Sequence, residues 1–185
     1  MTAARWTYGT TPWLGQHHPL AGVPGRTRVI IDNDFAGDPD DLFQLAHHLL
    51  VEGTQVCGVV VSRLREDDGW NRTGHSIQAG REKVEHLLEL MGVDGVNFYE
   101  GDDRGFADHD GPTAASRFIV EEAMREDDRP LYLVAGGSLG DVARAYKAEP
   151  AIADRLTLIW IGGSEHAGLA YVPAGASTLE YNMAL

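Results

Sequence analysis

The sequence has little cysteine, no long hydrophobic run and few basic residues, and each shortage excludes a class of protein. Cys57 is the one cysteine, so the chain has no internal disulfide and no cysteine-cluster metal site, and its apolar surroundings predict a core position. No apolar run reaches membrane-spanning length and no segment resembles a signal peptide, so we expect a cytoplasmic protein without membrane contact. With 15 Lys and Arg against 28 Asp and Glu, the net charge of -13 opposes binding to nucleic acid.

The chain is long and apolar enough for one globular domain, with 185 residues of which 43% are hydrophobic. From residue 28 on, short β-branched runs alternate with segments of helical spacing, which is typical of βαβ units. We therefore predict an α/β fold over 28–185, with an open, mostly parallel sheet and helices on both faces, preceded by an irregular extension over 1–27. The predicted strands are 28–32, 55–61, 95–99, 130–135 and 156–163, and the predicted helices are about 40–52, 76–92, 113–127 and 140–148.

Five aspartates fall within residues 32–41, between the first predicted strand and the first predicted helix. Asp32 and Asp34 are two positions apart at the end of the strand, so their side chains lean to the same face. Asp40 and Asp41 begin the helix, where free N–H groups and the helix dipole favour negative charge. Because ligands of open parallel sheets bind beyond the carboxyl ends of the strands, we expect three or four of these carboxylates to converge on a binding site.

Carboxylates so close together must take up protons or share a cation. Oxygen donors suit Ca²⁺ or Mg²⁺. The spacing is not that of an EF-hand loop, because the twelfth position counted from Asp32 holds Phe43 and not glutamate. The alternative is that Asp38, Asp40 and Asp41 form a solvated turn and helix cap. We favour metal binding for the whole set, because its first two members continue a strand with a buried pattern.

The stretch VIIDNDFAGDPDDLFQLA, residues 29–46, resembles the N-terminal fingerprint of the inosine–uridine nucleoside hydrolase superfamily. Residues 81–103 and 133–164 are similar to later segments of that family, and residues 180–182, EYN, look like its E-F-N motif. The resemblance implies the family's α/β fold and a calcium-dependent hydrolysis of the N-glycosidic bond of a ribonucleoside or related riboside, giving ribose and free base. It also implies a role in purine or pyrimidine salvage.

The resemblance assigns roles to individual residues. Asp40 would be the general base that takes a proton from the attacking water. The implied Ca²⁺ ligands are Asp34, Asp41 and the backbone carbonyl of Gly140. The residues implied to line the substrate pocket are Asp32, Glu180 and Asn182, the last two at the sugar hydroxyls.

The chain departs from the family pattern in three places. The family has an asparagine after its second strand that contacts the sugar, whereas this sequence continues with Arg63 and Arg65, and Ile161 replaces the methionine before Gly-Gly. Family members run well beyond this length and there provide a further aspartate ligand and, in many, the acid that protonates the departing base. The chain is then either a fragment of a longer enzyme or a degenerate half. We favour a fragment, which would bind calcium weakly and turn over slowly or not at all.

Two other functions fit part of the pattern. One is a non-catalytic riboside- or carbohydrate-binding module of the same fold. The other is a Mg²⁺-dependent, phosphatase-like phosphotransferase, since such enzymes also end a strand in Asp-x-Asp, although the threonine expected soon afterwards is missing from residues 35–37. The sequence does not choose the base of the nucleoside, and only the family's tendency to self-associate favours a homo-oligomer.

Overall fold

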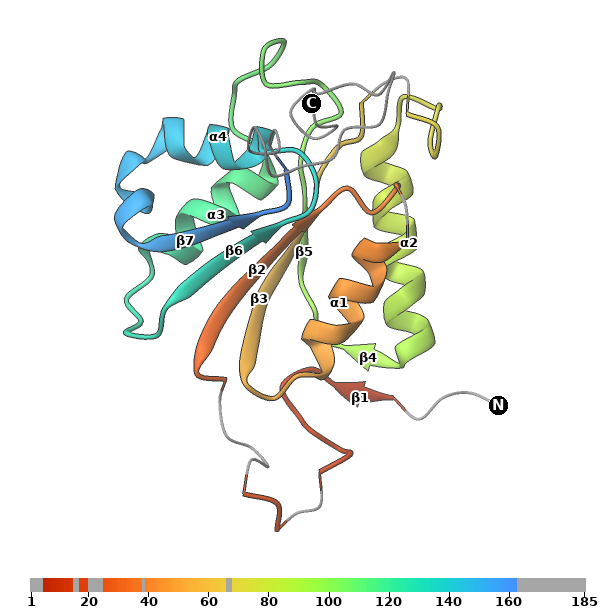
Figure 1. Ribbon diagram of the computed structural model, residues 1–185, viewed down its shortest axis with the longest axis vertical. Helices are drawn as coiled ribbons and strands as arrows, with labels where there is room; N and C mark the ends of the chain where they lie inside the picture. Colours follow the sequence, from red (N-terminus) through yellow and green to blue (C-terminus); the bar gives the residue numbers. More distant parts are fainter. Residues whose placement is uncertain (1–4, 15–16, 20–24, 38, 66–67, 163–185) are drawn as a thin grey trace, which may run out of the picture.

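The chain alternates strands and helices in a computed structural model that describes residues 5–14, 17–19, 25–37, 39–65 and 68–162. Five strands form one parallel sheet in the order β5-β3-β2-β6-β7 (Figure 1). These strands are β2 (Thr27–Asn33), β3 (Thr54–Val61), β5 (Phe98–Glu100), β6 (Leu131–Ala135) and β7 (Leu156–Trp160). The predicted fold class, an open parallel sheet with helices on both faces, is confirmed.

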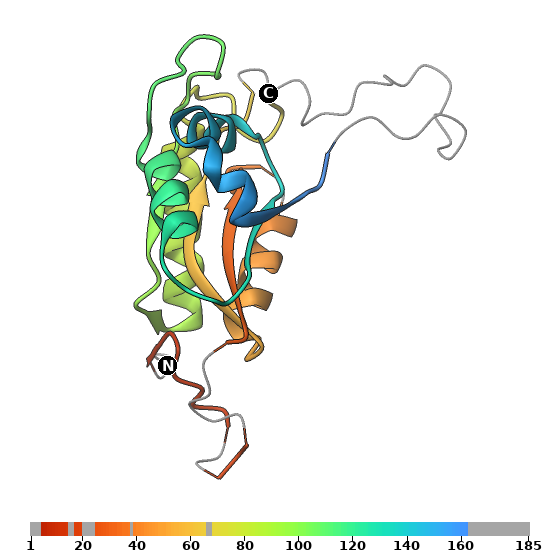
Figure 2. The same cartoon turned by 90° about the vertical axis from the view of Figure 1, so that its left-hand side faces the viewer.

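Two layers of helices cover the sheet, one on each face (Figure 2). The helices of one layer are α1 (Asp40–Leu50) and α2 (Ser76–Met91); those of the other are α3 (Ala114–Met124), α4 (Gly140–Ala148) and the 3-10 helix η1 (Pro150–Asp154). None of the helices in the described residues is long and apolar enough to cross a membrane.

The central strand β2 is buried on both faces, which explains its nearly continuous apolar sequence. Ile31 packs with α1 and α2, whereas the adjacent Ile30 packs with α3 and α4, and both side chains are 0% exposed. Burying each such side chain contributes about 1.5–3 kcal/mol. β2 is therefore packed tightly between the two helix layers, and this packing fixes the position of the residues at its carboxyl end.

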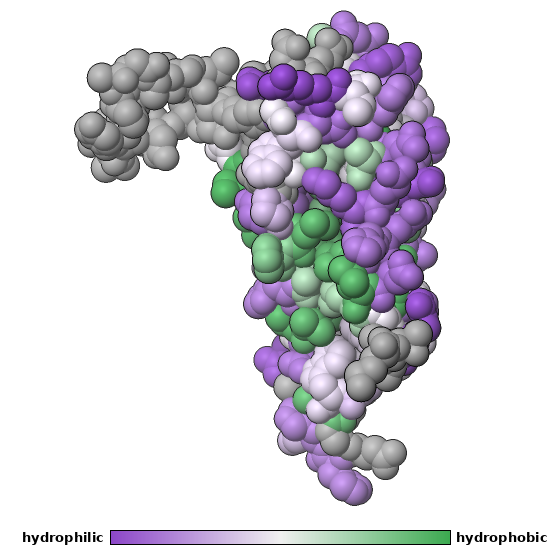
Figure 3. Space-filling view, turned by 90° about the vertical axis from the view of Figure 1, so that its right-hand side faces the viewer, coloured by the Kyte–Doolittle hydropathy of each residue, from purple (hydrophilic) through white to green (hydrophobic). Residues whose placement is uncertain are grey.

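The outer surface of α1 is less well covered. Figure 3 shows hydrophobic residues near the middle of the side that carries α1 and α2, with hydrophilic residues around them. Phe43 and Leu50 of α1 are 75% and 47% exposed. This apolar area lies away from the carboxyl end of the sheet.

Two element boundaries differ from the sequence prediction for physical reasons. The predicted strand 95–99 forms only from Phe98 on, as β5, and a separate short strand β4 (Val93–Asp94) precedes it. Gly95 lies between the two strands, and its positive φ of 84° interrupts the extended chain. The predicted helix 113–127 begins at Ala114, since Thr113 is its N-cap, and ends at Met124, where Arg125 adopts an extended conformation.

Part of the N-terminal segment that we expected to be irregular packs against the domain. β1 (Trp6–Thr7) pairs with β4 in a two-stranded parallel sheet. The hydroxyl of Tyr8 accepts a hydrogen bond of 2.8 Å from the backbone N–H of Val56 in β3. This segment thus covers the amino end of the sheet, opposite the predicted binding site.

Candidate functional site

The strand order creates a crevice at the carboxyl end of β2. From β2 the chain continues to β3 and then to β5 on one side, and returns to the other side of β2 as β6. At such a reversal the strand-to-helix loops diverge, and open parallel sheets bind their ligands there. The loops that follow β2 and β6 meet at this point, where the N–H of Gly136 donates to the Asp32 carbonyl at 2.9 Å and to Asn33 Oδ1 at 2.8 Å.

Asp34 and Asp41 lie against the glycine turn after β6. Their exposed fractions are 8% and 7%. A Cβ atom on Gly136 would lie 2.8 Å from Asp41 Oδ1, and one on Gly137 would lie 2.9 Å from Asp34 Cγ. The two glycines therefore let both carboxylates approach the backbone more closely than any side chain would allow. The structure brings these two predicted metal ligands to one turn.

Asp32 is fully buried behind this turn. Neither of its carboxylate oxygens has a hydrogen-bond partner within the described residues. Burial raises the pKa of Asp32 well above its ordinary value, and the charges of Asp141 and Asp34 raise it further. The Ser62 hydroxyl acts in the opposite direction, although it makes no hydrogen bond of normal geometry. A buried carboxyl without donors is a group that a bound cation stabilises.

Asp40 differs from its three neighbours because its side chain is exposed. Its Oδ1 accepts a hydrogen bond of 3.1 Å from the N–H of Asp41, at the start of α1. This contact joins neighbouring residues and is not a helix cap, because the N-cap of α1 is Pro39 and no side chain caps the helix. The predicted role of Asp40 as a general base stays a prediction.

The other predicted site residues are less well defined. Gly140 is the first residue of α4, and helical geometry directs its carbonyl along the helix, toward the C-terminal end of α4. Its role as a carbonyl ligand also stays a prediction. Glu180 and Asn182, the expected sugar contacts, lie outside the described residues, as does Asp38.

Asp141 is a site residue that the sequence prediction missed. It is 2% exposed, its Oδ1 accepts a hydrogen bond of 2.6 Å from Thr113 Oγ1, and Arg144 Nη1 lies 3.6 Å from the same oxygen. Burial raises the pKa of Asp141, while Thr113 and Arg144 oppose this shift. The one signal in the sequence is an acid directly after the glycine-containing loop at the end of β6.

Two side chains from α2 and the loop after β5 hold the site in place. Lys83 Nζ donates to the carbonyl oxygens of Ala36 and Gly37, at 3.0 Å each. Asp103 Oδ1 accepts from Ile77 N at 3.0 Å and thereby caps α2. The loop between β2 and α1 is therefore fixed from outside by a lysine that the sequence motif does not include.

The donor atoms fit part of a site for a hard cation. Asp34 and Asp41 are buried carboxylates on one glycine turn, and Asp32 lies behind them without donors. Oxygen donors favour Ca²⁺ or Mg²⁺ over metals that prefer nitrogen or sulfur. Within the described residues, however, no three His, Cys, Asp or Glu side chains meet as a metal-binding group. The described chain thus provides two direct ligands at most from this set.

A cavity of about 500 Å³ lies at the amino end of the sheet, lined by Tyr8, Trp13, Thr54, Cys57 and Glu122 among others. Burial is the main cause that raises the pKa of the Cys57 thiol to about 12, so the thiol is unreactive. Cys57 is only half-buried, although it packs against the core as predicted. We place the candidate site at the carboxyl end of β2 and not in this cavity, because the buried carboxylates and the strand reversal coincide there.

Comparisons with known proteins agree with this fold. No family model and no curated protein matches the chain. Solved structures with a similar fold include an inosine-uridine preferring nucleoside hydrolase from Bacillus anthracis, with a TM-score of 0.54 and 19% identity. This match covers 80% of the present chain and 54% of the hydrolase. An inosine-guanosine nucleoside hydrolase (TM-score 0.57, 20% identity) and a plant nucleoside hydrolase (TM-score 0.57, 18% identity) are also similar. Each of these two matches covers 75% of the present chain, and they cover 50% and 48% of the two hydrolases, respectively.

The chain thus spans about half the length of the solved structures that it matches. At the level of the fold, these matches agree with the family that the sequence resembles. The fold of this chain is that of the nucleoside hydrolases.

Proposed function

We propose that the protein hydrolyses the N-glycosidic bond of a ribonucleoside or a related riboside with the aid of Ca²⁺. One observation carries this proposal: Asp34 and Asp41 are buried on one glycine turn at the strand reversal of a nucleoside-hydrolase-like sheet. Cytoplasmic location, self-association and a role in nucleoside salvage are parts of the same proposal.

The residues support the chemistry in the following way. Asp34 and Asp41 would hold the calcium ion, which when bound supplies a positive charge that orients a sugar diol and makes water more acidic. Asp40 is exposed beside them and has a carboxylate available to take a proton from the attacking water. The carboxylates gathered at the turn would stabilise the oxocarbenium-like transition state that forms at the sugar.

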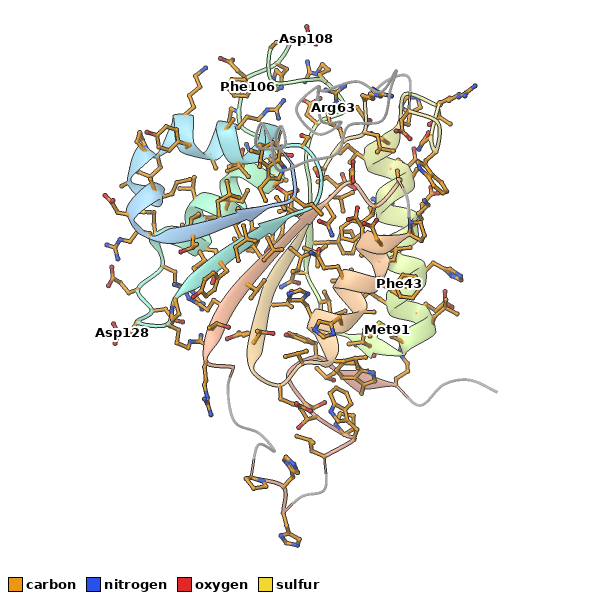
Figure 4. All side chains as sticks on the ribbon, viewed as in Figure 1. Phe43, Arg63, Met91, Phe106, Asp108 and Asp128 are labelled. Atoms are coloured by element: carbon orange, nitrogen blue, oxygen red, sulfur yellow. The ribbon has the colours of Figure 1, made fainter. Side chains whose placement is uncertain are left out.

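The test measures free base released from inosine and from uridine, by liquid chromatography, in Ca²⁺ and in EDTA. We expect slow release in Ca²⁺ and its loss in EDTA and in the Asp34→Asn variant. Asp128→Asn is the matched control, because Asp128 is an exposed aspartate at the opposite end of the molecule (Figure 4). It removes the same charge and leaves the rate unchanged.

Two results would contradict the proposal. If ribosides bind in Ca²⁺ but no base is released, the protein is a binding module of this fold. If the protein instead releases p-nitrophenol from p-nitrophenyl phosphate in Mg²⁺, the aspartates serve phosphoryl transfer.

A further inference from the structure

Arg63 is a half-buried arginine at the edge of the candidate site, and its side chain has no hydrogen-bond or ion-pair partner among the described residues. It lies two residues beyond the end of β3, at the same end of the sheet as Phe106 and Asp108 (Figure 4). Its Nε is buried and has no hydrogen-bond partner, and no hydrogen bond or ion pair from the described residues reaches its guanidinium group. A buried donor that stays unsatisfied costs about 1–3 kcal/mol, so its presence requires an explanation.

Two other arginines at this end of the sheet, Arg104 and Arg144, are hydrogen-bonded within the protein. Arg104 Nη2 donates to Asp102 Oδ2 at 2.7 Å, and Arg144 Nη2 donates to the His109 carbonyl at 2.7 Å. The loop 101–112 therefore contains enough acceptors for structural arginines, yet none of them is used for Arg63. This contrast separates Arg63 from arginines that hold the fold together.

The surroundings fix Arg63 beside the candidate site. On one side Ser62 N donates to the Asn33 carbonyl at 2.9 Å, and on the other Leu64 N donates to Ser76 Oγ at 3.0 Å. The Leu64 side chain packs on the loop after β2, where its Cδ2 would lie 3.2 Å from a Cβ on Gly37. The backbone of Arg63 is thus held next to the loop that carries Asp34.

The space around the guanidinium is also defined. A Cβ on Gly105 would lie 2.9 Å from Arg63 Nη1, so the absence of a side chain there gives the group its room. The same Cβ would lie 3.6 Å from Asp108 Oδ2, but no ion pair joins this exposed carboxylate to Arg63. Asp108 is therefore an internal competitor for an external ligand of Arg63.

We propose that Arg63 recognises an anionic group, a phosphate or a carboxylate, on the riboside substrate. The planar guanidinium presents paired donors that match either anion, and such charged hydrogen bonds are stronger than neutral ones. The net charge of -13 provides no general attraction for anions, so a local cation is needed to accept one. This inference rests on the proposed function. It narrows the proposed substrates, ribonucleosides and related ribosides, to those that carry an anionic group.

The test compares the binding of three probes by calorimetry in Ca²⁺: uridine, uridine 5′-monophosphate and orotidine, which carries its carboxylate on the base. We expect one of the two anionic probes to bind more tightly than uridine, and the tighter one identifies whether the phosphate or the carboxylate is recognised. Arg63→Gln should weaken that probe by roughly 10- to 100-fold and leave uridine unchanged. Arg63→Lys should restore part of the loss, because it keeps the charge without the paired donors.

Arg104→Gln is the matched control, since it removes one positive charge from the same end of the sheet but from an arginine already bonded to Asp102. It should leave the ratio of anionic to neutral binding unchanged. Because no described residue hydrogen-bonds to the Arg63 side chain, the melting temperatures of its variants should not fall below that of the wild type, which excludes unfolding as the cause of any loss.

The inference is overturned if the anionic probes bind no more tightly than uridine, or if Arg63→Gln leaves their advantage intact. It is also overturned if Asp108→Asn alone weakens the anionic probes as much as Arg63→Gln does, which would show that the pair acts as a structural unit. Base release from neutral nucleosides would then still support the hydrolase proposal. Arg63-dependent anion binding without base release would instead contradict the hydrolase proposal and leave anion recognition in place.

Discussion

Gly136→Ala tests whether the glycine turn after β6 shapes the candidate metal site. The added Cβ would lie 2.5 Å from Asn33 Oδ1 and 2.8 Å from Asp41 Oδ1, which is closer than real Cβ contacts. Asn33 cannot move away freely, because its Oδ1 accepts from Gly136 N at 2.8 Å and its Nδ2 donates to Gln44 Oε1 at 2.6 Å. The substitution must therefore displace Asp41 or break these hydrogen bonds.

The size of the effect follows from these contacts. Overpacking a tight site costs about 1–3 kcal/mol, and each lost hydrogen bond costs about 1 kcal/mol more. We expect the free energy of unfolding to fall by about 2–4 kcal/mol, which lowers the melting temperature of a chain of this size by roughly 5–15 °C. Displacement of Asp41 should also weaken calcium binding at least about tenfold, which corresponds to roughly 1.4 kcal/mol.

Thermal unfolding at increasing Ca²⁺ concentrations measures both quantities, because a ligand that binds only the folded state raises the melting temperature with its concentration. Gly53→Ala is the control: its Cβ would meet nothing closer than Val51 Cγ1 at 4.0 Å, so stability should change by less than about 1 kcal/mol. If Gly136→Ala melts like the wild type and shows the same response to Ca²⁺, the turn does not shape a metal site.

Three further predictions concern other parts of the structure. Glu122→Ala removes the carboxylate that lies 2.9 Å from the guanidinium of Arg28, which is 2% exposed, and leaves Asp127 Oδ2 at 3.7 Å as its acidic neighbour. Urea denaturation should show a free energy of unfolding lower by about 3 kcal/mol, and an unchanged value would contradict this. Lys83→Met removes both hydrogen bonds to the carbonyls of 36–37, so hydrogen exchange in the loop after β2 should accelerate and base release should fall. The melting temperature should fall by roughly 4–8 °C, because each lost hydrogen bond costs about 1 kcal/mol. Because burial raises the folded-state pKa of Asp32, the folded protein binds more protons than the unfolded chain, and without metal its free energy of unfolding should decrease as pH rises above about 4. Asp32→Asn should flatten this decrease in urea titrations in EDTA at pH 5 and pH 7, and an unchanged slope would show that Asp32 titrates normally.

The sequence predicts the fold well because the strands are buried on both faces. β2, β3 and β6 have continuous apolar runs, and these runs are typical of central parallel strands. The division between β4 and β5 was not predicted, because the positive φ of Gly95 depends on how the chain turns there and not on hydrophobicity.

The candidate site was predicted only in part. Asp40 and Asp41 are adjacent in the motif, and the sequence does not show which of them is buried. Adjacent residues on a helix point about 100° apart, so only one of the two side chains can face the glycine turn. Which one does so depends on where α1 begins, after Pro39. Asp141 was missed because its burial depends on Thr113, which is distant in the sequence and becomes its neighbour only when α3 packs beside α4.

The most direct test of the account is anomalous diffraction from crystals of the protein grown in millimolar Ca²⁺. We expect an anomalous peak between the carboxylates of Asp34 and Asp41, at oxygen distances of about 2.3–2.6 Å, and no peak in crystals of Asp34→Asn. Well-ordered carboxylates with only water between them, at calcium concentrations that saturate any change in melting temperature, would contradict the central claim that this turn is a calcium site.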